Sequence, residues 1–125
     1  MIAAVMFSFA GCKTSQEYPV DTTLSVQDIH WNETGSSENE PAIYSPVETG
    51  DIVYDYMDCE IEVKSVSEDS VVLDIDGCLV EPNSDGSINL RADPLEQIEL
   101  EAGESITLVS QTMDAGIRIV ITYEG

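Results

Sequence analysis

Residues 61–75 read IEVKSVSEDSVVLDI, and the clearest folding signal in the chain lies there. Apolar and polar residues alternate over 61–63 and again over 71–75, which is the period-two pattern of a half-buried strand. The polar run 67–70 separates the two stretches, so we expect them to pair as an antiparallel hairpin. The acidic neighbours of the apolar residues then face water: Glu60, Glu62, Asp74 and Asp76.

The rest of the carboxy-terminal part repeats this arrangement, with short apolar runs between turn signals about 8 to 12 residues apart. The candidate strands are 52–56, 61–66, 71–80, 88–91, 97–100, 105–109 and 116–123. A segment with helical periodicity and useful length is not found. The pattern predicts an all-β fold, a small antiparallel β-sandwich of about seven strands that follows a disordered tether.

A second hairpin is expected between residues 97–100 and 105–109. Ile98 and Leu100 then face Ile106 and Leu108 across a short polar turn. Gly103 lies in this turn and can supply the positive φ that a tight connection needs.

Composition and charge agree with a small folded β domain. The 125 residues include 24 Ile and Val against 7 Leu and 7 Ala, which favours strands over helices. Asp and Glu number 25 against 4 Lys and Arg, and the formal net charge is -21. Such a surface repels phosphate backbones and has no basic cluster, so nucleic acid is excluded as a partner.

The amino terminus has the pattern that predicts a targeting signal. Residues 2–10 are uncharged and mostly apolar, and as a helix they would span about 14 Å, half of a hydrocarbon core. The run Phe9-Ala10-Gly11-Cys12 that ends this segment resembles the lipobox of bacterial lipoproteins. The resemblance implies removal of residues 1–11, a lipidated Cys12 as the membrane anchor, and a location in the bacterial cell envelope, facing outside the cytoplasm.

Residues 12–48 are interpreted as the lipidated cysteine and a flexible acidic linker, and 49–125 as the sandwich domain. The linker is polar and is interrupted by Pro19, Pro41 and Pro46. Within it, residues 24–31 alternate well enough to form an edge strand, and they carry the only His and the only Trp of the chain. Docking of this stretch on the domain and a free tether are both left open.

The carboxy-terminal part also resembles the small all-β domains of uncharacterised bacterial lipoproteins. The residues that carry this resemblance are the run Gly103-Glu104-Ser105-Ile106-Thr107-Leu108 and, after it, Thr112-Met113-Asp114-Ala115-Gly116. It implies an extracytoplasmic sandwich domain, and no activity is transferred with it.

Lipidation of Cys12 would leave the pair Cys59 and Cys78 outside the cytoplasm, where disulfides persist. In the first hairpin the two cysteines fall nearly opposite each other at the end away from the turn. Strict alternation points Cys59 inward and Cys78 outward, so a disulfide needs a bulge, which Gly77 can provide. The alternative is two separate buried thiols.

Catalytic and metal-binding patterns are weak. One His, His30, supports neither a Cys-His nucleophile nor a Ser triad without a third orienting group, and zinc needs more N and S ligands than this chain offers. The segment 74–77 fails the spacing of a calcium loop. Weak candidates for a calcium site in loops are Asp85, Asp93 and Asp114, although solvated turn aspartates explain them equally well.

The function expected from the sequence is a lipid-anchored extracytoplasmic binding or interaction module without catalysis and without a cofactor. Its partners would be the membrane, through Cys12, and an unknown protein or envelope component. The alternatives are a calcium-stabilised adhesion-type domain and an accessory domain of a surface hydrolase.

Overall fold

The computed structural model describes residues 22–56, 58–77 and 79–125, and in these residues the chain folds into strands without helices. The prediction of an all-β antiparallel sandwich is confirmed, with ten strands in two sheets within the described part instead of about seven. The strands are β1 (Leu24–Asn32), β2 (Gly35–Glu38), β3 (Ala42–Tyr44), β4 (Ile52–Tyr56), β5 (Cys59–Val66), β6 (Ser70–Asp76), β7 (Leu79–Val80), β8 (Gln97–Glu101), β9 (Glu104–Ser110) and β10 (Ala115–Tyr123).

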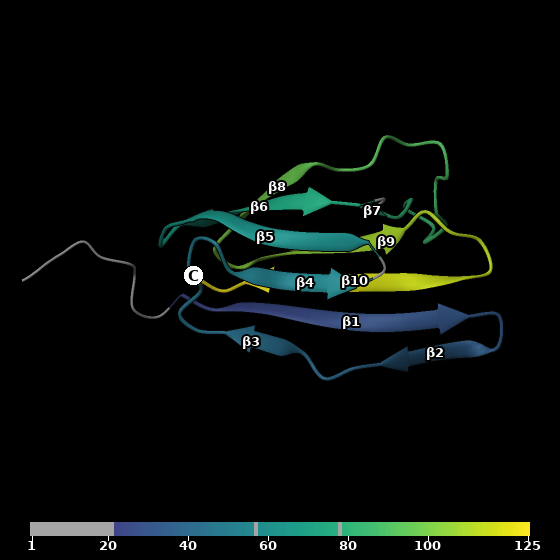
Figure 1. The fold of residues 1–125 in the computed structure, drawn as a ribbon, viewed down its shortest axis with the longest axis horizontal. Helices are drawn as coiled ribbons and strands as arrows, with labels where there is room; N and C mark the ends of the chain where they lie inside the picture. Colours follow the sequence, from purple (N-terminus) through teal and green to yellow (C-terminus); the bar gives the residue numbers. More distant parts are fainter. Residues whose placement is uncertain (1–21, 57, 78) are drawn as a thin grey trace, which may run out of the picture.

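The two sheets have simple antiparallel orders. One sheet has four strands in the order β4-β5-β6-β8, and the other runs β2-β1-β10-β9-β7, with β3 also paired to β1. Figure 1 shows β1 running along the molecule beside β10, with the short β2 and β3 on its other side. The long central pair β1 and β10 therefore supports the six-stranded sheet.

The first hairpin forms as the sequence predicts. Ile61 lies opposite Ile75 and Val63 opposite Leu73, and all four side chains are buried. The register shifts between Val63 and Ser65, where Lys64 is the extra residue of a β-bulge.

The strand expected at 71–80 is wrong as one continuous element, because the chain leaves the four-stranded sheet after Asp76 and joins the other sheet as β7. Gly77 sits at the crossing with φ +133°. A Cβ at this position would lie 2.9 Å from both the Cα and the Sγ of Cys59. Only glycine tolerates both the backbone angle and this close approach.

The second expected hairpin is also wrong. β8 pairs with β6, and β9 pairs with β10 and β7, so the turn around Gly103 connects one sheet to the other. Gly103 has the expected positive φ of +93°, and its N–H donates to Tyr123 while that of Ala102 donates to Asp69. Alternation determines which face of each strand is buried. It does not determine the sheet to which the strand belongs, because both sheets bury one face against the same core.

The strand expected at 88–91 does not form, and residues 81–96 are a loop. Polar side chains in this loop accept hydrogen bonds from backbone N–H groups that would otherwise pair with a neighbouring strand. Ser87 donates to Asp85 at 2.9 Å, and Arg91 donates to Asn89 at 3.0 Å. Local side-chain bonds of this kind compete with strand pairing.

The linker expected over residues 12–48 is corrected for residues 22–48, which belong to the sandwich. β1 is an interior strand and not an edge strand, because it pairs with β10 on one side and with β2 and β3 on the other. Leu24, Val26 and Val47 are buried in the core. The stretch looks polar partly because β2 is an exposed strand of Gly, Ser and Glu.

The core lies between the sheets and is built by alternate residues of the long strands. The largest fully buried side chains include Tyr123, Leu24, Ile61, Leu73, Leu79, Leu108, Ile117, Ile119 and Ile121. Tyr123 keeps its hydroxyl satisfied by donating to the carbonyl of Ser67 in the turn of the first hairpin. Burial, followed by the charges of Asp69 and Glu68, raises the pKa of Tyr123.

Candidate functional site

The strand β1 carries the side chains that stand out chemically on both of its sides. Residues pointing into the sandwich change along the strand from apolar Leu24 and Val26 to Asp28 and His30. Residues pointing outward end in Ile29 and Trp31, which line a cleft on the outer side of the sheet. The structure therefore offers an inward polar network and an outward cleft on one strand.

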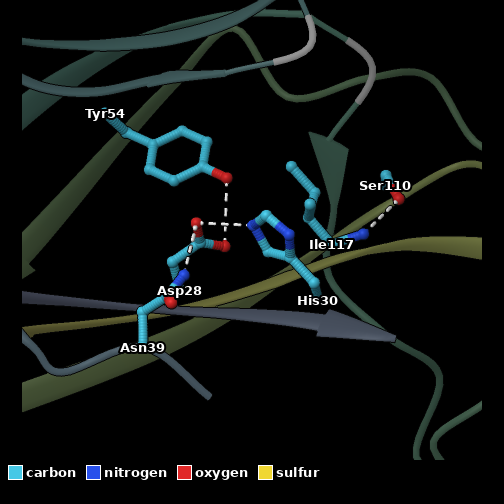
Figure 2. A network of polar contacts seen from close by, with 6 residues as sticks. All are labelled: Asp28, His30, Asn39, Tyr54, Ser110 and Ile117. Carbon is cyan, nitrogen blue, oxygen red and sulfur yellow. Dashed lines mark hydrogen bonds and ion pairs between the residues drawn. The ribbon is translucent and has the colours of Figure 1, made fainter. Parts of the chain in front are cut away.

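The inward network is centred on the carboxylate of Asp28 (Figure 2). Nε2 of His30 lies 2.9 Å from Oδ2, and the hydroxyl of Tyr54 donates to Oδ1 at 3.1 Å. Asn39 adds a longer contact of 3.5 Å from its amide nitrogen to Oδ2. An ionised carboxylate only accepts hydrogen bonds, so Nε2 of His30 carries the proton in this arrangement.

Tyr54 comes from β4, so the Asp28 network joins the two sheets. Burial is the largest cause that raises the pKa of Tyr54, followed by the negative charge of Asp28 and the hydrogen bond to it. The phenol therefore stays neutral and keeps donating at physiological pH. The ring of Tyr56, also on β4, packs at a tilt against the imidazole of His30, with the two ring centroids 4.7 Å apart, and the His30 side chain stays 38% exposed.

An Asp-His pair supports nucleophilic catalysis only when the imidazole also reaches a nucleophile. Within the described residues, the partners that the structure gives to His30 are Asp28 and the ring of Tyr56, and neither is an activated nucleophile. The hydrogen bonds hold β1 against β4 at the end of the interface where apolar residues stop. The arrangement fits a polar clamp between the sheets.

The outward cleft has a volume of about 520 Å³, within the range of small-molecule sites. It lies over β1, β2 and β10, and the loop 81–96 forms one wall. Its lining residues are Ile29, Trp31, Ser36, Glu38, Gly86, Ser87, Ile88 and Arg118. Apolar side chains and a few polar groups of both charges thus converge on one space.

Trp31 in the cleft rests on Gly116, its direct neighbour in β10. A Cβ at position 116 would lie 2.8 Å from Cζ2 of the indole and 2.3 Å from the hydroxyl oxygens of Ser110 and Thr112. Ser110 is fixed, because it accepts the backbone N–H of Ile117 at 3.0 Å (Figure 2) and contacts Thr112 at 2.9 Å. Glycine at 116 therefore lets the indole lie directly on the sheet.

The loop that walls the cleft is held in place by hydrogen bonds. The side-chain amide of Gln111 donates to the carbonyls of Asn89 and Ala92, at 3.1 and 2.7 Å. The hydroxyl and the N–H of Ser87 both donate to Asp85, and these two bonds lower the pKa of that carboxyl. The wall is therefore a defined surface.

Charge is divided unequally between the outer sides of the two sheets. The outer side of the four-stranded sheet, called the acidic face here, carries the seven carboxylates Asp55, Glu60, Glu62, Asp74, Asp76, Glu99 and Glu101. On the outer side of the six-stranded sheet, called the neutral face, the charged residues at the described strand positions are Glu38 and Arg118. No described carboxylate lies within ion-pair distance of Arg118. The cleft belongs to the neutral face.

The predicted calcium candidates do not come together. Asp85, Asp93 and Asp114 are exposed, and the carboxylate of Asp85 accepts a hydrogen bond from the hydroxyl of Ser87. No group of three or more His, Cys, Asp or Glu side chains able to hold a metal is found among the described residues. The surroundings of these three residues agree with the alternative interpretation, that they are solvated aspartates in turns.

The predicted cysteine sites fall largely outside the described residues. Cys12, with the lipobox-like run before it, and Cys78 lie in the parts that the structure does not describe. Cys59 is buried at the start of β5, beside Gly77, which directly precedes Cys78. The pairing of Cys59 with Cys78 stays a prediction.

Sequence reasoning did not assign the cleft, although it singled out residues 24–31. The only Trp of the chain was a signal, but its place over Gly116 and beside Arg118 depends on the pairing of β1 with β10. Residues from β2 and from the loop 81–96 complete the cleft, and neither was expected to contact β1.

Comparison with protein-family models, with curated proteins and with solved structures found no match to this chain. Among the described residues, no helix is long and apolar enough to cross a membrane.

Proposed function

We propose that the chain is a non-catalytic binding module, anchored by a lipidated Cys12 on the outer side of a bacterial membrane, and that the cleft over Trp31 is its binding site. The observation that carries the proposal is the cleft itself. Trp31 and Arg118 converge there on an otherwise nearly uncharged sheet face, beside a wall held by its own hydrogen bonds. Convergent apolar and polar groups in a concave space are the usual mark of a ligand site.

The direction of β1 supports this arrangement. Nine residues, 13–21, separate Cys12 from Thr22, and fully extended they reach at most about 30 Å. β1 starts near Thr22 and ends beyond Trp31, so the cleft lies at the end of β1 away from the anchored end. A module attached in this way presents its cleft away from the membrane.

The inward Asp28 network supports binding over catalysis. Both oxygens of the carboxylate already accept hydrogen bonds from within the fold, and the partners of the imidazole among the described residues are Asp28 and the ring of Tyr56. A histidine that acts as the base in nucleophilic catalysis also needs a nucleophile within reach, and neither of these partners is one. The network thus accounts for the only His without assigning a reaction to it.

The anchor is tested by expressing the full chain and a Cys12→Ala variant in a bacterial host and measuring their partition between membrane and soluble fractions. We expect the wild type in membranes, with residues 1–11 removed and an acyl mass added, and the variant in the soluble fraction. Equal partition of the two chains, with an unmodified intact mass, would contradict the anchor. The mass before and after reduction also tests the disulfide, because a Cys59–Cys78 bridge gains two protons.

A further inference from the structure

We infer that the cleft over Trp31 binds a saccharide that carries a carboxylate, as a uronic acid unit does. The inference rests on the proposed function, because it names the ligand class of the same site. Three features of the cleft carry it: a cation without an ion-pair partner among the described residues, a flat aromatic surface, and polar groups that complement hydroxyls.

The cation is Arg118, at the centre of the neutral face. Its guanidinium has no described carboxylate within ion-pair distance, although the chain holds 25 acidic residues. Glu38 is separated from it by β1, because Glu38 and Arg118 are both paired with Ile29, from opposite sides. The planar fork of an arginine matches a carboxylate with two parallel hydrogen bonds.

The acidic face does not cancel this attraction. The backbones of packed sheets lie about 10 Å apart, and the outward side chains on both sides bring the separation to roughly 20 Å. At physiological ionic strength the Debye length is about 8 Å, so charges of the acidic face are largely screened at Arg118. A ligand with a single carboxylate per unit is favoured over a doubly charged phosphate, because Glu38 also lines the cleft and repels a second negative charge more strongly.

The flat surface is the indole of Trp31. Gly116 beneath it and Ser36 opposite it in β2 leave the ring beside small residues, and Ile29 and Ile88 extend the apolar lining. An aromatic ring carries negative charge on its face, so it attracts the slightly positive C–H groups on one side of a pyranose ring. Stacking of this kind suits a sugar better than a flexible chain.

The remaining polar groups distinguish a sugar acid from an apolar carboxylate. Glu38 lines the cleft and accepts hydrogen bonds, and the hydroxyl of Ser36 both donates and accepts, whereas the hydroxyl of Ser87 is engaged by Asp85 and Asn83. A fatty acid would offer Ser36 and Glu38 no hydrogen bond and would place its chain beside a charge. Sugar hydroxyls can donate to Glu38 and exchange hydrogen bonds with Ser36, so a saccharide complements both the polar groups and the apolar lining of the cleft.

The test uses the fluorescence of Trp31, which is the only Trp in the chain and therefore reports on the cleft directly. The full chain is titrated with digalacturonic acid, with its methyl ester and with decanoate. We expect a saturable change with digalacturonic acid, at least about tenfold weaker binding of the ester, which lacks the charge, and no saturable change with decanoate.

Two substitutions remove one positive charge each from opposite faces of the sandwich. Arg118→Gln should weaken digalacturonic acid binding at least about tenfold, whereas Lys64→Gln, on the four-stranded sheet, should leave it within about twofold. Thermal melts of both variants check that the fold is intact. Trp31→Ala, followed by ¹⁵N resonance shifts in place of fluorescence, should abolish the binding.

Each contrary outcome overturns a defined part of the inference. Equal binding of acid and ester, or no effect of Arg118→Gln, would remove the carboxylate from the ligand class but leave the cleft as the site. Saturable binding of decanoate without digalacturonic acid would replace the saccharide by an apolar acid. No response to any probe would overturn the ligand class, while membrane partition of the Cys12→Ala variant still decides the anchor separately.

Discussion

The two outer faces of this sandwich are built from strands with the same alternation, yet they differ sharply in charge. On the acidic face, carboxylates lie directly opposite one another in neighbouring strands, as Glu60 does with Asp76 and Glu62 with Asp74. On the neutral face, the corresponding positions hold Ser, Thr, Gln, Gly, Val, Ile and Trp, with Arg118 and Glu38 as the charged residues of the described strands.

The difference in charge has opposite consequences for the two faces. Like charges directly opposite each other destabilise a strand pair, so the acidic face contributes solubility at a cost in stability. The neutral face instead retains apolar and aromatic side chains beside a single cation, which agrees with the binding site proposed there. The core between the sheets supplies the stability that both faces depend on.

The comparison is tested most strongly by Gly116→Ala, which adds one methyl group beneath the cleft. The new Cβ would displace Ser110 from the N–H of Ile117, so we expect a loss of about 1–3 kcal/mol in the free energy of unfolding and a shifted Trp31 emission. Urea denaturation followed by circular dichroism measures the loss. Ser25→Ala, on the same face but away from the cleft, should stay within about 0.5 kcal/mol. Similar values for both variants would mean that the neutral face has no special geometry at Trp31.

A second test removes the hydroxyl that joins the two sheets. Tyr54→Phe loses the hydrogen bond to Asp28 and should cost about 1–2 kcal/mol at pH 7, because the acceptor is charged but still partly exposed. Tyr56→Phe keeps the ring over His30 and should change stability by less than about 0.5 kcal/mol.

The pH dependence sharpens this second test. The pKa of Tyr54 is raised in the folded state, so its neutral phenol contributes stability fully below the unfolded value of about 10, and that contribution is lost as pH rises above it. The wild type and Tyr54→Phe should therefore converge in stability above about pH 10, with Tyr123 contributing a remaining slope in both chains. A constant difference from pH 7 to 11 would argue against the Tyr54 assignment.

The smallest effect is expected on the acidic face. Glu62→Gln relieves repulsion with Asp74 and should stabilise the chain by about 0.2–1 kcal/mol at low ionic strength, and the gain should vanish in concentrated salt. Glu38→Gln, on the neutral face, relieves no such pair and should give no gain. Melting temperatures at two salt concentrations measure both, and an equal gain at the two positions would remove the electrostatic distinction between the faces.

Much of the sandwich follows from local pattern. The first hairpin has the predicted register because Ile61, Val63, Leu73 and Ile75 must all face the core and the run 67–70 can only turn. Gly103 adopts the positive φ that its turn position indicates. Strand 52–56 was predicted with its observed bounds.

The pairing partners of several strands, in contrast, could not be predicted from the local pattern. The alternation at Ile98 and Leu100 and at Ile106 and Leu108 is that of a hairpin, but β8 and β9 lie in different sheets. The pattern does not distinguish the two arrangements, because the inward apolar residues are buried in the same core in both. The polar stretch before residue 49 was interpreted as a linker because only Leu24 and Val26 of β1 are strongly apolar and buried. Its place depends on the long β10, which offers a complete edge for pairing.

The sequence by itself determined the fold class, the acidity of one surface and the burial of alternate residues, because period-two patterning and charge are local properties of the chain. The cleft was decided by tertiary structure, since Trp31, Ser36, Ile88 and Arg118 come from four separate segments that meet only after β1 inserts beside β10. The same insertion places Asp28 and His30 opposite Tyr54. Contacts between distant segments depend on which strand edges remain available once the core has formed, and no local pattern contains that information.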